Sequence, residues 1–419
     1  MLRYLPLLAG LGALFTAGVA LNIPREPGGR NVFLDINNQR DVLGQVSING
    51  ILAVGMTLVI LSGGIDLSVG SVMSLCTVVC AMLLMQQPGA GYRYLSRAHA
   101  LMLPAVALFG VLVGYGLVWR LRRLPVAVAA ASGVGLAIGG AWLALGRPGA
   151  PGPAAASSTL GVLLVVPLVG GMMGLLSGAI IARTRLQPFI VTLAMMVSAV
   201  GLAKYTAGHG GQIHAIYTGD AERPGAPASF ERLGGTILSV GQETLRGGKV
   251  RDLKLLPIPG IFLLGAWTVA AVLLNKYPLG RYVYAIGGNE EAARLAGVPV
   301  PGVKVFVYAA SGLLAGLAAV LYCAQYTQGK ADAGQGKELD AIAAVVIGGT
   351  SLMGGRGSIL GTLVGVMIFG YLTNILQLRS VSSEIQDILK GVIIVGAAVV
   401  QSGDLMSLVR SWFVRPGPA

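Results

Sequence analysis

Charged side chains are scarce in this chain of 419 residues. Asp, Glu, Lys and Arg make up 11% of the sequence, 54% of it is hydrophobic, and the mean hydropathy is +0.75. A soluble domain of this length would need far more polar surface, so that class is excluded. Several apolar runs reach the ~18 residues needed to cross a hydrocarbon core about 30 Å thick. The sequence therefore predicts an all-α polytopic membrane protein.

The chain also lacks a loop for binding nucleotide phosphates. The pattern Gly-x-x-x-x-Gly-Lys-Ser/Thr is absent, because each Gly-Lys pair is followed by Val, Ala or Glu. We therefore expect no cofactor on this chain. Any ATP-driven activity would need a partner that binds ATP and magnesium.

Cysteine and histidine are too few to suggest a metal centre or a disulfide framework. The three histidines lack the His-Glu-x-x-His spacing, and the hydrolase pattern Gly-x-Ser-x-Gly is absent. Cys76 and Cys80 share one helix face at i, i+4 spacing. With no histidine or third cysteine near them, packing is favoured over a metal or redox pair. We predict neither a metal site nor an enzyme.

Basic residues outnumber acidic ones, which gives a net charge of +13. They are scattered among loops, without the aromatic-interleaved patch expected for nucleic-acid binding. Contact with membrane lipid headgroups and control of orientation are the favoured roles.

Twelve apolar segments are predicted to span the membrane, some of them as discontinuous helices. They cover residues 2–22, 43–62, 68–87, 101–118, 125–145, 160–182, 187–206, 255–275, 304–324, 338–353, 357–377 and 384–402. Twelve crossings put both termini on one side. The short basic loops at 119–125 and 183–185 favour the cytoplasm for that side.

A single transmembrane domain, 1–419, is predicted, with two departures from a plain bundle. Its parts are the first helices (2–100), an inserted hairpin and Pro/Gly/Ala-rich connector (101–158), core helices (159–206), an extracytoplasmic loop (207–254), further core helices (255–402) around a cytoplasmic loop (276–303), and a cytoplasmic tail (403–419). The loop at 207–254 either caps the outer mouth or contacts a partner, or it is a mobile insertion.

Glycine patterns recur along the chain. Residues 63–70 and 348–355 both follow Gly-Gly-x-x-Leu-x-x-Gly, which predicts helix breaks around a central pathway; chance similarity in a chain with 63 glycines is the alternative. Glycines four residues apart at 170–178 and 357–365 predict close helix packing instead.

Asp66 is the acidic residue expected within the membrane. An unpaired aspartate there costs about 2.5–3.5 kcal/mol. Asp66 could offset this cost by capping a helix that starts at Leu67, or it could contact the transported solute. The two roles are compatible.

Other candidates for the pathway, most of them polar residues or glycines, are Asn49, Gly63, Gly64, Ser68, Gln187, Phe189, Thr192, Glu338, Asp340, Gly348, Gly349 and Thr350. Each has a structural alternative. Asn49 could bond between helices, and Pro188 favours plain helix initiation for the segment at 187–192. Asp387 and Lys390, at i, i+3 spacing, favour an ion pair over a proton relay.

A short polar helix is predicted at 289–297, between two apolar segments. Its residues are Asn289, Glu290, Glu291, Ala292, Ala293, Arg294, Leu295, Ala296 and Gly297. The charged residues share one face, the alanines keep the helix slim, and the final glycine would end it in the left-handed conformation. Such a helix either seats in a neighbouring subunit or is simply solvated.

Four stretches taken together resemble the permease subunits of bacterial ribose/xylose-type ABC sugar importers. They are QVSINGILAVGMTLVILSGGIDLSVGSVMSL (45–75), QPFIVTLAMM (187–196), GRYVYAIGGNEEAARLAGV (280–298) and ELDAIAAVVIGGTSLMGGRGSILGT (338–362), in the family's order. The resemblance implies an inner-membrane subunit that works with an ABC-type ATPase, a periplasmic or lipid-anchored sugar-binding protein and a second permease copy.

The resemblance also assigns roles to residues. Glu291, Ala292, Ala293 and Gly297 match the loop that couples such permeases to the ATPase, and Asp66 matches a segment bordering the pathway. The expected function is ATP-driven import of a monosaccharide by alternating access. An ion-coupled secondary transporter, or a membrane assembly factor without transport, is the alternative.

Overall fold

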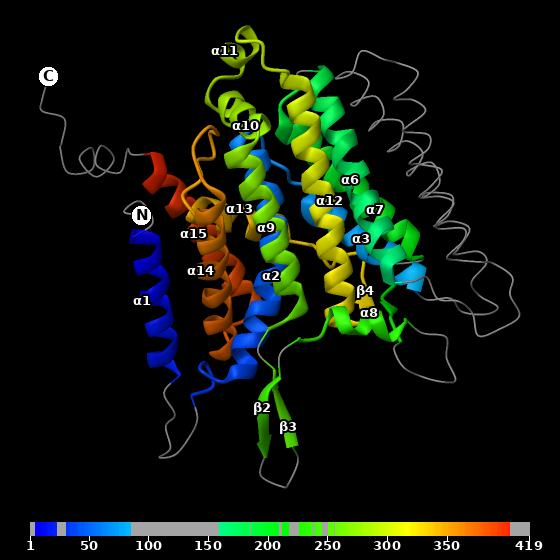
Figure 1. Cartoon of the computed structure of the whole chain (residues 1–419), viewed down its shortest axis with the longest axis vertical. Coiled ribbons are helices and arrows are strands. Elements are labelled where there is room, and N and C mark those ends of the chain that lie inside the picture. The colour runs from blue at the N-terminus through cyan, green and yellow to red at the C-terminus, as the bar shows by residue number, and fades with distance from the viewer. Residues whose placement is uncertain are drawn as a thin grey trace, which may run out of the picture.

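The computed structural model describes residues 5–22, 31–84, 159–184, 186–208, 212–217, 226–237, 239–244, 250–254 and 256–402. The predicted hairpin at 101–145 and the tail at 403–419 lie outside these residues. Within them the chain is mostly helical, and its long helices run side by side as a bundle (Figure 1).

Six of the described helices are long and apolar enough to cross a membrane. They are α2 (Ile36–Leu61), α6 (Thr159–Thr184), α7 (Pro188–Ala207), α9 (Ile258–Lys276), α12 (Val300–Tyr326) and α14 (Ile359–Leu378). The shorter helices are α1 (Leu5–Leu21), α3 (Val69–Leu84), α8 (Ala228–Leu233), α10 (Pro278–Gly288), α11 (Glu290–Leu295) and α13 (Lys337–Ile347), and α15 (Ser383–Ser402) closes the described chain. The prediction of a helical, polytopic membrane protein is confirmed.

The predicted span at 338–353 is wrong in length. Its helix, α13, has 11 residues and ends at Ile347, whereas a full crossing needs about 20. Gly-Gly-Thr-Ser follows Ile347, and Gly349 adopts φ +82° and stops the helix. α13 is therefore a half-helix, of the kind that the glycine pattern predicts.

Both Gly-Gly pairs end a helix, but the first glycine of one pair and the second glycine of the other take the helix-ending position. Gly63 (φ +78°) terminates α2, and Gly349 terminates α13. In each case the following amide bonds back into the last turn, Gly64 to the Val59 carbonyl at 3.1 Å and Thr350 to the Val345 carbonyl at 3.2 Å. The sequence echo thus corresponds to a shared helix-ending motif, with a shifted register.

Glycines bring α6 and α12 into backbone contact. A Cβ on Gly170 would overlap the Gly312 carbonyl oxygen, and one on Gly174 would overlap that of Tyr308. Gly365 of α14 approaches the Ala344 carbonyl of α13 in the same way. Close approach through small residues is how helices associate without water between them. The predicted packing role is therefore confirmed for the glycines at 170–178 and for Gly361 and Gly365, whereas Gly357 lies before α14 and outside any helix.

α2 lies in the middle of the bundle and contacts α9, α12, α13 and α14. Its residues from Val46 to Leu61 are buried almost without exception, which suits a helix that is apolar on all sides. α2 therefore forms a wall shared by the elements that surround the site described below.

The segment at 207–254 is not the plain loop that we predicted. It contains α8 and the hairpin of β2 (Ser239–Thr244) and β3 (Val250–Lys254), and its β1 (His214–Ala215) pairs antiparallel with β4 (Gln328–Gly329). The hairpin projects from the end of the bundle opposite α11 (Figure 1). The all-α description therefore holds for the spans and fails at this end.

Candidate translocation cavity and coupling helix

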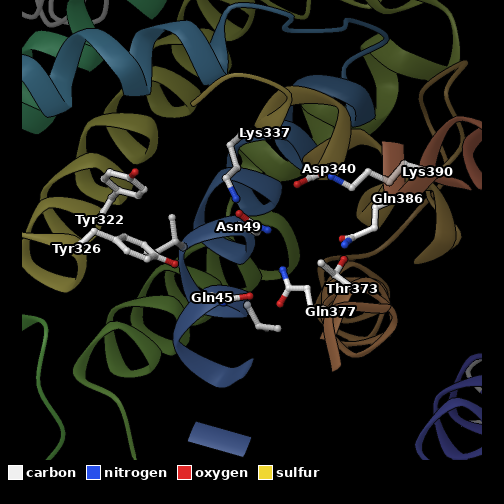
Figure 2. Close-up of a pocket in the computed structure, with 13 residues that line it drawn as sticks. Gln45, Asn49, Tyr322, Tyr326, Lys337, Asp340, Thr373, Gln377, Gln386 and Lys390 are labelled. Atoms are coloured by element: carbon white, nitrogen blue, oxygen red, sulfur yellow. The ribbon is translucent and has the colours of Figure 1, made fainter. Parts of the chain in front are cut away.

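A polar cavity of about 230 Å³ lies among α2, α12, α13, α14 and α15 (Figure 2). Its lining residues are Gln45, Val46, Ile48, Asn49, Tyr322, Tyr326, Lys337, Asp340, Gly370, Thr373, Gln377, Gln386 and Lys390. Two of the predicted pathway residues, Asn49 and Asp340, are among them. Most of the lining is amide or hydroxyl, which suits a solute rich in hydroxyl groups.

Asn49 offers an unused acceptor to this cavity. Its Oδ1 atom is buried and has no hydrogen-bond partner in the described part of the chain. A buried, unpaired carbonyl costs roughly 1–3 kcal/mol. This unpaired oxygen makes Asn49 a candidate for binding a hydroxyl group in the cavity.

An ion-paired lysine fixes one side of the cavity. Lys390 Nζ lies 3.1 Å from Asp340 Oδ1 and 3.3 Å from Asp387 Oδ1. The predicted pair of Asp387 with Lys390 is confirmed, and Asp340, only 7% exposed, is a second partner. The lysine thereby ties α15 to the half-helix α13.

The remaining polar lining was missed, although the sequence carries a signal for it. Gln45 and Asn49, Tyr322 and Tyr326, and Thr373 and Gln377 are pairs at i, i+4 spacing within apolar helices. Such spacing puts both members on one face. In an apolar span, a polar pair of this kind indicates a face that is turned away from lipid.

Asp66 lies outside the cavity lining, wholly buried by its own segment and α12. Its carboxylate accepts the backbone amide of Ser68 at 3.0 Å, the Ser68 hydroxyl at 2.6 Å and the Ser311 hydroxyl at 2.9 Å. α3 begins at Val69 rather than Leu67. Asp66 therefore lies three residues before the helix, and the amide that it accepts, from Ser68, precedes the first helical residue. Ser311, far away in the sequence, was not anticipated.

The three predicted pathway residues at the start of α7 differ in burial. Thr192 is fully buried, and its hydroxyl donates to carbonyls of its own helix and lies 3.2 Å from the Ile65 carbonyl beside Asp66. Gln187 is exposed and Phe189 is 49% exposed. The structure therefore brings only Thr192 to the Asp66 segment, and none of the three lines the cavity.

Apart from Asp340, the candidates around α13 lie at its two ends, outside the cavity lining. Glu338 accepts the Gly336 amide at 3.3 Å and approaches Gly70. At the other end Gly348 packs against the Gly361 backbone, and Thr350 is fully buried. These residues shape the half-helix, while Asp340 alone among them faces the cavity.

α11 is built as predicted and stands out from the bundle (Figure 1). The Asn289 side chain accepts the Ala292 amide at 3.0 Å and caps the helix. Gly297 has φ +82°, the left-handed conformation expected at its end. Glu290 binds Lys304 of α12 at 2.7 Å and Arg294 at 3.2 Å, so the helix is tied to a long span.

The free side of α11 is part charged and part apolar. The Glu291 side chain is 72% exposed and Leu295 is 82% exposed, whereas Ala293 is buried against the protein. A leucine exposed to this degree at the tip of a short polar helix suits insertion into a partner. Leu295 was not among the predicted docking residues.

The three cysteines lie closer together than the sequence indicated. Cys323 of α12 approaches Cys80 of α3, so a third cysteine does stand near the pair. All three are free and buried. No metal-holding group of His, Cys, Asp or Glu occurs among the described residues.

A bundle of apolar helices around a polar cavity, with a polar helix exposed at one end, defines a membrane transport subunit. Residues 39–132 and 113–398 match the family described as "Branched-chain amino acid transport system / permease component". The chain belongs to this permease family. It is a multi-pass protein of the bacterial inner membrane.

Curated relatives narrow the comparison. The ribose import permease protein RbsC of Escherichia coli K12 is 36% identical over 375 residues, 88% of this chain and 87% of that protein. RbsC of Bacillus subtilis 168 is 34% identical, over 88% and 85% of the two chains. The xylose transport system permease protein XylH of Escherichia coli K12 is 31% identical, over 88% and 86%. No solved structure matches.

Proposed function

We propose that this chain is the transmembrane subunit of an ATP-driven importer that moves a monosaccharide into the cell. The carrying observation is the cavity, with its amide and hydroxyl lining and the unused Asn49 acceptor. The names of the ribose and xylose permeases that it resembles agree with that chemistry.

The family description names branched-chain amino acids, and the cavity argues against such a solute. An aliphatic side chain needs an apolar subsite, but Val46 and Ile48 are the only large aliphatic residues of the lining. Tyr322 and Tyr326 instead offer ring faces with polar edges. That combination suits a sugar, which has apolar C–H faces and a rim of hydroxyls.

The topology follows from the same proposal. α11 faces the cytoplasm, where an ABC-type ATPase holds it and supplies both ATP and magnesium. Both termini then lie on the cytoplasmic side as well. The end that carries β2 and β3 faces outward, toward a periplasmic or lipid-anchored binding protein, and a second copy of the permease completes a homodimer in the lipid bilayer.

Transport proceeds by alternating access. ATP binding draws the two ATPases together, and their movement reaches the spans through α11. The solute shifts the balance of inward- and outward-open states only by its different affinity for each. A cavity that binds sugar weakly, with selectivity left mainly to the binding protein, fits this requirement.

The test uses the whole complex, permease with its ATPase and binding protein, in proteoliposomes. We expect ATP-dependent accumulation of labelled ribose or xylose, and none of leucine. Accumulation that an uncoupler abolishes at constant ATP would support a secondary transporter instead. Accumulation of solute by the purified permease alone would refute the proposal.

A further inference from the structure

The end of α10, just before the coupling helix α11, is packed backbone to backbone against two other segments. A Cβ on Gly287 would overlap the Leu61 carbonyl oxygen and the Gly355 nitrogen. A Cβ on Gly355 would lie 2.7 Å from the Gly288 nitrogen and 2.8 Å from its Cα. Only glycine permits this approach.

The two segments are the two Gly-Gly-x-x-Leu-x-x-Gly breaks themselves. A Cβ on Gly354, in the second break, would lie 2.8 Å from the Gly63 Cα, in the first, and 3.0 Å from the Gly287 Cα. The Gly355 amide donates to the Leu61 carbonyl at 3.1 Å, which closes the contact. Gly63, Gly287, Gly354 and Gly355 are called the glycine junction below.

Each arm of the junction leads to a wall of the cavity. Leu61 ends α2, which carries Asn49, and the connector with Gly354 follows α13, which carries Asp340. The third arm is α10, followed directly by α11, which Glu290 also ties to α12 through Lys304 at 2.7 Å. A displacement of α11 would therefore reach α2 and α13, two walls of the cavity, through this one contact.

We propose that Gly287 is the positioning residue that transmits movement of α11 to the two helix breaks. The inference rests on the proposed function. Because the contact is between backbones, it has no side chain that can rotate away and absorb the movement. Interiors packed in this way pass displacement on rather than deforming.

The chain supplies a matched control in the next residue. A Cβ on Gly288 would meet no other atom of the described chain within 4 Å, and neither glycine has positive φ. Gly287→Ala and Gly288→Ala thus add the same methyl group to the same helix end. Only the methyl group of Gly287→Ala would collide with the other segments of the glycine junction.

The experiment compares both variants in the full complex, with uptake of labelled ribose and ATP hydrolysis measured per assembled complex. We expect Gly287→Ala to lower sugar moved per ATP by at least about fivefold, the lower range of coupling between sites, while hydrolysis continues. Gly288→Ala should stay close to the unmodified protein. Equal transport per ATP in both variants would overturn the inference.

The outcomes separate the two proposals. Absence of ATP-driven sugar uptake by the unmodified complex refutes the proposed function, whatever the variants do. If Gly287→Ala does not assemble, hydrogen exchange of the unmodified complex decides. The Gly355 amide should exchange at different rates with and without bound ATP, and identical rates would overturn the role of the junction.

Discussion

At the scale of single residues, Asp66 shows how a carboxylate is held inside the bundle. Three donors from two serines surround it, and it is 1% exposed. The sequence predicted a local partner, and the Ser68 amide is one. Ser311 belongs to a helix 245 residues further along, a relation that no local pattern reveals.

Asp66→Ala should destabilise the protein more than Asp66→Asn. Alanine leaves two buried serine hydroxyls and an amide without their acceptor, at a cost of about 1–3 kcal/mol. Asparagine keeps one acceptor oxygen in a side chain of the same shape. Thermal unfolding of the purified variants measures the difference, and equal melting temperatures would contradict it. Loss of uptake by a stable Asp66→Asn variant would indicate solute contact.

Asn49→Ala should lower sugar uptake while leaving folding intact. The substitution removes a cavity-lining acceptor that has no hydrogen-bond partner among the described residues. Asn275→Ala is the control, because that side chain is exposed on α9 and bonds its own helix at 2.8 Å. The measurement is sugar uptake by the two variants at matched expression. Equal uptake rates would show that Asn49 does not contact the solute.

At the scale of elements, apolar runs located the long helices because length and hydropathy suffice for that. They failed at α13, where two glycines inside an apolar stretch end the helix after 11 residues. The short strands at 214–215 and 328–329 were beyond reach, because their pairing joins distant segments. Of the cavity lining, the sequence predicted only Asn49 and Asp340. The other lining residues were missed because they come from five helices that only the folded bundle brings together.

The tie between α13 and α15 should depend on Lys390 far more than on Asp387. Lys390→Met removes the closest cation from the buried Asp340 carboxylate and leaves it only the more distant charge of Lys337. Breaking a buried ion pair in this way costs about 3–5 kcal/mol. Asp387, 73% exposed, forms a surface pair, and such pairs contribute about 0–1 kcal/mol. The melting temperatures of Lys390→Met and Asp387→Asn should therefore differ clearly. Similar melting temperatures would show that the buried ion pair does not stabilise the fold.

Changes on the free side of α11 should separate hydrolysis from transport. Glu291→Ala removes an exposed charge, and Leu295→Ala removes an exposed apolar side chain. Glu291 makes only an exposed ion pair with Arg294 at 3.9 Å, and Leu295 is 82% exposed, so membrane insertion should be unchanged. Retention of the ATPase on affinity-tagged permease measures the docking. Ala293→Leu, at the buried side, serves as the contrast that disturbs packing instead.

At the scale of the whole molecule, class and family could be predicted from the sequence because several motifs occur together in order. The sequence could not place the segments at 63–70 and 348–355 against each other. Their contact depends on α10 bringing Gly287 between them, which is a property of the assembled bundle. For the same reason the Cys80 neighbour, Cys323, went unnoticed.

The direct approach of α6 and α12 has a mechanical consequence. Gly170 and Gly312, and further along Pro167 and Gly316, meet main chain to main chain, leaving no room for one helix to slide along the other. We therefore expect the two helices to move together as one rigid unit during transport, with any bending confined to their ends. A cross-link between α6 and α12 should then leave transport unchanged, whereas a cross-link that fixes their ends to neighbouring segments should stop it.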